Sequence, residues 1–192
     1  MKSVRTVPVL LLHQETFGGM GRAATFLKES CRCQGRDFNE LTLTTPEREE
    51  VDQGQLTIVA LAHFARLIFR YCGIIVAHRP SGVYIPIAQS GLPLLRDLLL
   101  IALANMARVQ TRIHLHGSQL VDLISGSTPR ARLVRRLTKK SRWAVLSERL
   151  RAILLDAGFA AGQVFTLRNP AFPSDAIAPR HKSNELLTVG FL

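Results

Sequence analysis

Short apolar runs alternate with helical segments along most of the chain, and this alternation limits the possible folds more than any other feature of the sequence. The first run, Val4–Leu12, is almost continuously apolar, as expected for a strand buried on both faces of a sheet. Five more strands are predicted at Phe38–Leu43, Val83–Ala88, Thr111–Leu115, Trp143–Leu146 and Val164–Leu167. Strands separated by helices form parallel sheets. The sequence therefore predicts an α/β, Rossmann-like, doubly wound and mostly parallel sheet.

The helices between these strands are predicted from apolar residues that recur every three or four positions. In the first helix, one face carries Met20, Ala23, Ala24, Leu27 and Cys31. Leu56–His78 is interrupted by His63, Arg66 and Arg70, so we expect a buried helix with one polar stripe rather than a membrane span. Further helices are predicted at Leu92–Val109 and after Ser147, a plausible N-cap, ending at Gly158. Ser125–Pro129 is predicted as a loop, followed by a basic segment.

The composition is that of a globular protein with a cationic surface. Of the 192 residues, 47% are hydrophobic and 20% charged, which excludes a disordered chain, and the net charge is +11. Such a charge suits anionic partners without choosing among them. Cys31, Cys33 and Cys72 lack the spacing of a zinc site, so we expect no metal and reduced thiols in a cytoplasmic protein.

A glycine-rich segment follows the first strand and is open to several interpretations. Its Gly19-x-Gly21-x-x-Ala24 pattern suits a dinucleotide site, but His13–Phe17 separate it from the strand and Glu40 lies inside the second strand. This mismatch disfavours binding of NAD or FAD. Gly18 and Gly19 would also let the backbone approach a phosphate at the N-terminus of the next helix. The glycines would equally serve only to make the turn.

The stretch "RWAVLSERLRAILLDAGFAAGQVFTLRNPAF" at Arg142–Phe172 resembles the end of the N-terminal domain of family-4-type glycosyltransferases of the GT-B fold. Other landmarks match in order. Gly18-Gly19 is similar to the glycine pair after that family's first strand, and "TRIHLHGSQ" to the strand that ends in its active-site histidine, which places that role on His116. "ELLTVGFL" is similar to the first strand of the family's second domain.

The resemblance implies an enzyme that transfers a sugar from a nucleotide-diphosphate donor to a glycan or lipid-linked acceptor, with retention and without a metal or cofactor. Gly18 and Gly19 would face the donor phosphates, and His116 would position the donor sugar. Residues 1–170 would form the acceptor-side domain, 171–184 a linker and 185–192 the start of a second domain. The glutamate pair and nucleotide pocket of that domain are missing from the sequence, so we expect that these residues alone transfer no sugar at an appreciable rate. The chain would then be either the product of a truncated gene or a fragment of a longer enzyme.

Two further features keep a second interpretation open, a non-catalytic binding module with a basic surface for anionic partners. One helix face would carry Arg132, Arg135, Arg136 and Lys139, which is either an ordinary solvated face or a contact for anionic lipid headgroups at the inner face of a membrane. Nucleic acid is not expected as a partner, because aromatic residues are not interleaved with these cations and Trp143 is predicted to be core. His114 is predicted to be either a packed core residue or a functional one.

Overall fold

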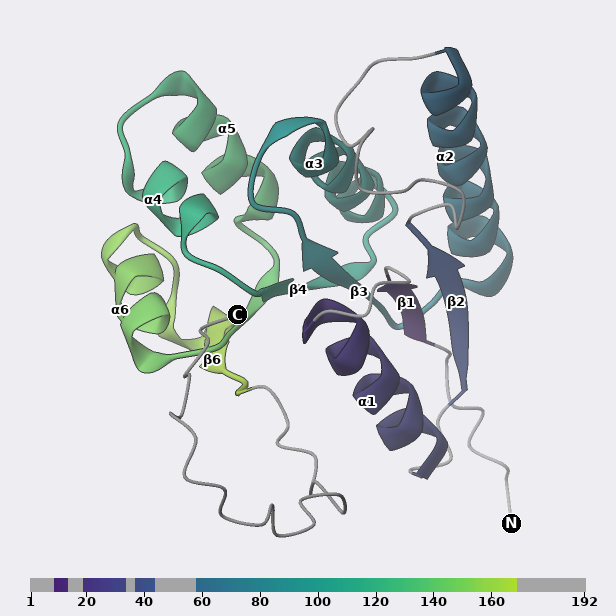
Figure 1. Cartoon of the computed structure of the whole chain (residues 1–192), viewed down its shortest axis with the longest axis horizontal. Helices are drawn as coiled ribbons and strands as arrows, with labels where there is room; N and C mark the ends of the chain where they lie inside the picture. Colours follow the sequence, from purple (N-terminus) through teal and green to yellow (C-terminus); the bar gives the residue numbers. More distant parts are fainter. Residues whose placement is uncertain (1–8, 14–18, 34–36, 44–57, 169–192) are drawn as a thin grey trace, which may run out of the picture.

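The computed structural model describes residues 9–13, 19–33, 37–43 and 58–168, and these contain one six-stranded sheet in the order β2-β1-β3-β4-β5-β6 (Figure 1). The strands are β1 (Val9–His13), β2 (Phe38–Thr42), β3 (Gly82–Ile87), β4 (Gln110–Leu115), β5 (Arg142–Val145) and β6 (Val164–Thr166). Every neighbouring pair is parallel. The predicted α/β Rossmann-like fold is confirmed. Residues 4–8 of the first predicted strand and the expected linker and second-domain strand lie outside the described residues.

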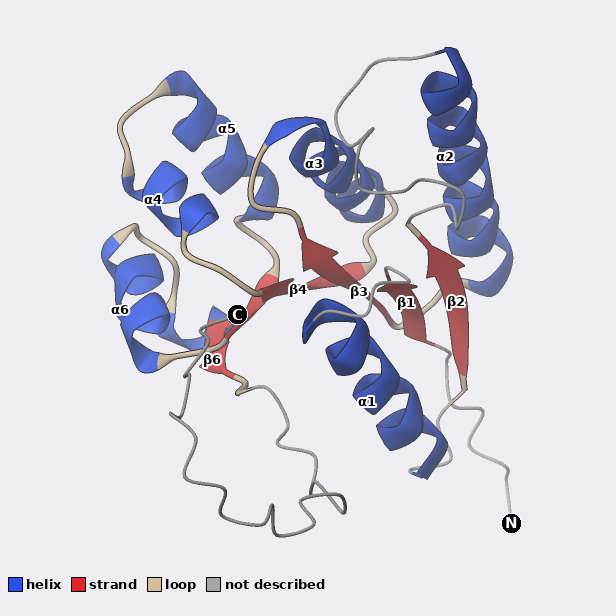
Figure 2. Ribbon diagram, in the orientation of Figure 1, coloured by secondary structure: helices blue, strands red, loops and turns tan. Residues whose placement is uncertain are grey.

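The helices lie on both faces of the sheet (Figure 2). They are α1 (Gly19–Cys33), α2 (Ile58–His78), α3 (Gly91–Met106), α4 (Gln119–Ser125), α5 (Pro129–Thr138) and α6 (Glu148–Asp156), with a 3₁₀ turn at Ala161–Gln163. The chain steps from β1 outward to β2, and every later connection steps in the opposite direction. Right-handed crossovers therefore place α1 on one face of the sheet and the other helices on the opposite face, as Figure 1 shows.

The main hydrophobic core lies between the sheet and helices α2 to α6, on the face opposite α1. All six residues of β3 are buried, and Val83, Ile85 and Ile87 point into this core. Trp143 of β5 is fully buried and packs edge-to-face on Phe159, with ring centroids 5.5 Å apart. Trp143 is therefore a core residue, as predicted.

Helix ends follow the capping rules where the sequence carries a clear signal. The Ser147 hydroxyl accepts a hydrogen bond from the Leu150 N–H at 3.3 Å, which confirms the predicted N-cap. Gly158 closes α6 with φ +94°, a conformation that glycine adopts without strain. Helix α4 was not predicted. Its seven residues are too few for a clear periodicity, although Leu120, Val121 and Ile124 are fully buried.

Helix α2 corrects the prediction of a buried helix. Only 11% of the residues in Leu61–His78 are buried, and this segment is long and apolar enough, by length and composition, to cross a membrane. One face does pack on the protein, where the Tyr71 hydroxyl donates to the Leu100 carbonyl of α3 at 3.0 Å. Phe69 is 79% exposed. The apolar residues of this helix therefore form two faces, and only one of them contributes to the core.

Helix α5 corrects the prediction of a continuous basic face. Arg135 turns inward, and its Nη1 donates to the carbonyl oxygens of Ile124 and Gly126 in the α4–α5 connection. Lys139 lies just beyond the end of α5, as its C-cap residue. Arg132 and Arg136 remain exposed on this helix. Arg135 is thus part of the fold, and the cationic surface of α5 is smaller than the sequence indicated.

Candidate functional site

The carboxyl ends of the strands form the edge of the sheet where ligands bind in open α/β folds, at the point where the chain reverses its direction across the sheet. Here that point lies between β1, whose chain continues into α1, and β3, whose chain continues into α3 on the other face. Among the described residues, the Ala88–Ser90 loop after β3 and the His116–Ser118 loop after β4 lie at this edge.

His116 directly follows β4 and lies at this edge, as predicted. Its imidazole is half-buried, and its buried Nε2 atom has no hydrogen-bond partner among the described residues. Burial lowers the pKa of His116 below its usual value, so the ring is neutral at physiological pH. A neutral imidazole with an unpaired ring nitrogen is suited to one directional hydrogen bond to a ligand. Arg96 Nη2, His114 Nε2 and Trp143 Nε1 are also buried without a partner among the described residues, but they lie within α3, β4 and β5, whereas His116 follows the end of a strand.

His114 and Tyr84 support the His116 ring from inside the sheet. The His114 and His116 rings lie 4.0 Å apart at a tilt of 43°. The Tyr84 hydroxyl lies 2.5 Å from His114 Nδ1, and a Tyr84 O–H that donates to this nitrogen leaves the His114 proton on Nε2. Burial and the neighbouring His116 lower the pKa of His114 to about 3. His114 is thus a buried, neutral residue that fixes the plane against which His116 packs.

Gln89 joins the β3 loop to the β4 loop. Its side-chain Oε1 accepts a hydrogen bond from the Leu120 N–H in the first turn of α4 at 3.2 Å. Gly117 leaves room for this side chain, because a Cβ atom there would lie 2.8 Å from Gln89 Nε2. Gln89 therefore holds the loop that contains His116.

Gly117→Ala is expected to displace Gln89 and lower the free energy of unfolding by about 1 kcal/mol, the value of the lost hydrogen bond. Urea unfolding of Gly117→Ala, Gln89→Ala and the double variant measures the loss in the free energy of unfolding. The two changes should not add, because both remove the same contact. Gly162→Ala is the matched control, since nothing lies within 4 Å of an added Cβ there. Additive losses would contradict this account of the loop.

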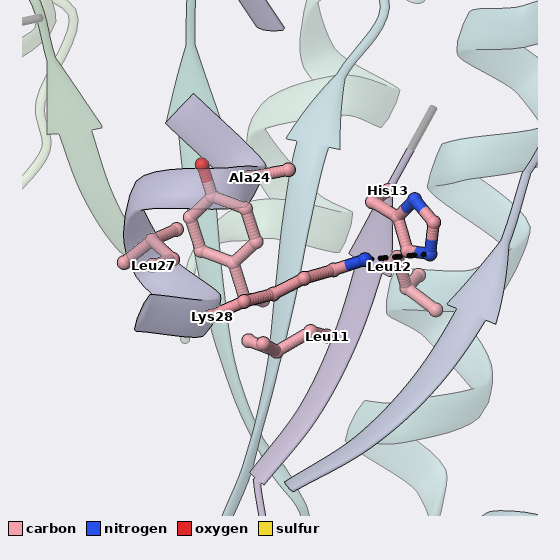
Figure 3. A pocket seen from close by; sticks show the side chains of 7 residues that line it. Leu11, Leu12, His13, Ala24, Leu27 and Lys28 are labelled. Atoms are coloured by element: carbon pink, nitrogen blue, oxygen red, sulfur yellow. Dashed lines mark hydrogen bonds between the residues drawn. The ribbon is translucent and has the colours of Figure 1, made fainter. Parts of the chain in front are cut away.

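A second polar cluster lies between α1 and the carboxyl end of β1 (Figure 3). Lys28 Nζ lies 2.5 Å from Glu40 Oε2, and the buried His13 Nε2 lies 3.4 Å from both atoms. Leu11, Ala24 and Leu27 line the small space beside Lys28. The register that pairs Leu11 with Glu40 places the Glu40 carboxylate under α1, where Lys28 neutralises it. Glu40 is therefore inside β2 and already paired, which further disfavours the dinucleotide interpretation.

An ion pair that the sequence analysis missed fixes the β3 loop from the other side. Asp97 of α3 is fully buried, and its Oδ2 accepts a hydrogen bond from the Ala88 N–H at 2.8 Å. Its Oδ1 accepts from Arg96 Nε at 2.9 Å, and Arg96 Nη1 donates to the Leu43 carbonyl just after β2. Adjacent charges of opposite sign on a helix are usually solvent-exposed, so only the fold reveals that this pair ties β2 and β3 together at the edge.

The structure places the sequence-predicted site residues at one edge, with one strand between them. Gly19 is the first residue of α1, and β3 separates β1 from β4 and His116. Adjacent strands lie about 4.8 Å apart, so β1 and β4 are separated by about 10 Å. Gly18 lies outside the described residues. Gly21 lies within α1 rather than in the loop. In the described part of the chain, no three His, Cys, Asp or Glu side chains gather as metal ligands.

Comparisons with known proteins show a fold likeness only. No protein-family model and no curated protein sequence matches the chain. Among solved structures, it is similar to HepE from Anabaena, solved in complex with UDP and glucose, with 16% sequence identity and a TM-score of 0.47. The match covers 85% of this chain and 44% of the HepE chain, so this chain spans less than half of that protein. A likeness of this strength assigns no activity.

Proposed function

We propose that this chain is the acceptor-side domain of a retaining, metal-independent glycosyltransferase of the GT-B type. The observation that carries the proposal is the unpaired, buried Nε2 of His116 at the carboxyl edge of the sheet, next to the point where the strand order reverses. His116 also lies in one of the sequence motifs, "TRIHLHGSQ", that resemble family-4-type enzymes. In this proposal the donor is a nucleotide-diphosphate sugar and the acceptor is a glycan or a lipid-linked glycan.

The neutral His116 imidazole positions the donor sugar by a hydrogen bond to one of its hydroxyl groups. It does not act as a charged acid, because burial lowers its pKa. The N-terminus of α1, with Gly19 as its first residue, offers backbone N–H groups and a partial positive charge to the donor diphosphate. Negative charge develops on that diphosphate as the bond to the sugar breaks, so these groups would stabilise the transition state more than the ground state.

The spacing of the strands that precede these two groups is compatible with one ligand. About 10 Å lies between β1 and β4, and a diphosphate linked to a hexose spans a comparable length. The nucleotide itself would be held by a second domain, and we propose that the described domain alone transfers no sugar at an appreciable rate. The proposed location is the cytoplasm, where nucleotide sugars are the donors.

Nuclear magnetic resonance titration tests the proposal with the protein as it is. UDP-glucose or GDP-mannose at about 10 mM is expected to shift the His116 imidazole and Gly19 amide signals, because a half-site binds weakly. NAD, NADP and FAD carry a diphosphate but no donor sugar, so they should leave the His116 signal in place and should not raise the melting temperature. A clear melting shift with one of these cofactors would overturn the proposal in favour of a dinucleotide enzyme.

The net charge of +11 favours one alternative, a non-catalytic module that binds anionic partners. Such a module would respond to polyanions at its exposed arginines, such as Arg132 and Arg136, and not at His116. Inorganic pyrophosphate and a nucleotide sugar would then give the same shifts in the same titration. A response that requires the sugar supports the transferase and excludes this alternative.

A further inference from the structure

Helix α2 carries a second apolar face that the protein leaves exposed. At 100° per residue, one side of the helix collects Ile58, Leu61, Ala62, Ala65, Phe69 and Val76. The four large residues are highly exposed: Ile58 88%, Leu61 62%, Phe69 79% and Val76 74%. Single exposed apolar residues are ordinary, but a row of them along five turns of one helix marks a contact surface.

The charges beside this row all have the same sign. His63, Arg66 and Arg70 are exposed and lie together along one flank of the apolar row. The 21 residues of α2 include no aspartate or glutamate. An apolar face bordered by arginines, with no carboxylate on the helix, is the pattern of helices that lie in the interface of an anionic bilayer.

The third side of α2 packs against the protein and so fixes which side of the helix faces outward. Tyr71 and Ile75 are buried in the core, and the Tyr71 hydroxyl is bonded to the Leu100 carbonyl of α3. Figure 1 shows α2 at the outer end of the molecule, beside α3. A helix whose second half is held against the core in this way lies on a membrane surface and does not span it, even though Leu61–His78 is long enough to do so.

We infer that α2 docks this protein on the surface of an anionic membrane, with the apolar row inserted among the acyl chains and Arg66 and Arg70 contacting lipid headgroups. This inference does not depend on the proposed function, and it moves the expected membrane contact from α5 to α2. A second copy of the chain fits this face less well. Pairing α2 with α2 would bring together two cationic helices that carry no carboxylate to neutralise them.

Vesicle co-sedimentation tests the inference. The protein is mixed with vesicles of phosphatidylglycerol and phosphatidylcholine, and with vesicles of phosphatidylcholine alone, at low and at physiological salt. We expect binding to the anionic vesicles only, weakened by salt. Phe69→Asp should lower the partition coefficient at least tenfold. Arg66→Gln with Arg70→Gln should lower it by about fivefold for each arginine.

Matched controls separate α2 from the rest of the surface. Met106→Asp introduces the same carboxylate at an exposed apolar residue of α3, which is 80% exposed, and should leave binding unchanged. Arg132→Gln with Arg136→Gln removes two exposed charges from α5 and should change binding by less than the α2 pair does. Light scattering of each variant reports the oligomeric state.

Three results would overturn the inference. The first is an absence of binding to anionic vesicles. The second is equal loss of binding in the α5 pair and the α2 pair, or in Met106→Asp and Phe69→Asp. The third is a concentration-dependent dimer that Phe69→Asp dissociates, with no vesicle binding, which would assign the face to a second copy. None of these results bears on His116, so the proposed function is tested separately.

Discussion

Asp97→Ala is expected to lower the free energy of unfolding by about 3–5 kcal/mol, the loss typical of breaking a buried ion pair on one side. The Asp97 carboxylate is fully buried, and its removal leaves the Ala88 N–H and Arg96 Nε without their hydrogen-bond partner and the Arg96 charge without its counter-ion. Burial raises the pKa of Asp97, while Arg96 and the Ala88 N–H favour the charged form. Urea unfolding monitored by circular dichroism measures the loss.

Two variants make this prediction specific. Asp97→Asn keeps an acceptor for the Ala88 N–H and should cost only about 1–2 kcal/mol. Asp156→Ala removes an exposed carboxylate at the end of α6 and should change stability by less than about 0.5 kcal/mol. Equal losses in Asp97→Ala and Asp156→Ala would show that the Arg96–Asp97 pair does not fix the β3 loop.

Acid is expected to destabilise the protein through His114. Its native pKa is about 3, because of burial and then the neighbouring His116, whereas the ordinary histidine value is 6.5. Between these two values the unfolded chain binds a proton that the native protein does not, so stability falls as the pH falls. At about 1.4 kcal/mol per pH unit, His114 accounts for a loss of about 3 kcal/mol from pH 6.5 to pH 4.

Denaturant unfolding at a series of pH values from 7 to 4 measures this slope. His114→Asn should reduce this slope by up to the equivalent of one bound proton, about 1.4 kcal/mol per pH unit, because the variant lacks the histidine whose pKa is lowered in the native protein. Tyr84→Phe, which removes the hydroxyl but keeps the imidazole, should retain the slope while lowering stability at every pH. An unchanged slope in His114→Asn would mean that His114 is protonated in the native protein.

The sheet could be predicted from the sequence because β1 and β3 are almost continuously apolar, and the other strands are short runs with β-branched, aromatic or leucine residues between helical segments. β3 is buried at all six positions, so each of its residues had to be apolar or small. Ser147 and Gly158 act through local backbone geometry, and the structure confirms both. Such features depend on neighbouring residues alone, and this is why the sequence reveals them.

Features that depend on distant residues could not be predicted. Helix α2 has enough apolar residues for a buried helix, and only its position at the outer end of the fold shows that Phe69 is exposed. Arg135 belongs to a basic run by composition, yet it bonds to carbonyl groups of the preceding connection. The Lys28–Glu40 contact needs the register of β1 with β2 and the placement of α1. His116 could be proposed as a site residue only because its place at the end of a strand accompanied a wider resemblance.

The most direct measurement for the central proposal is the affinity of this protein for a nucleotide-diphosphate sugar compared with the same nucleotide diphosphate without the sugar. Titration of UDP-glucose and UDP against wild type, His116→Ala and His116→Gln gives the comparison. We predict that wild type prefers UDP-glucose by about fivefold, the value of one hydrogen bond. His116→Ala should lose this preference, and His116→Gln should keep part of it. Equal binding of both ligands by wild type, or a preference that survives in His116→Ala, would contradict a sugar-positioning role for His116.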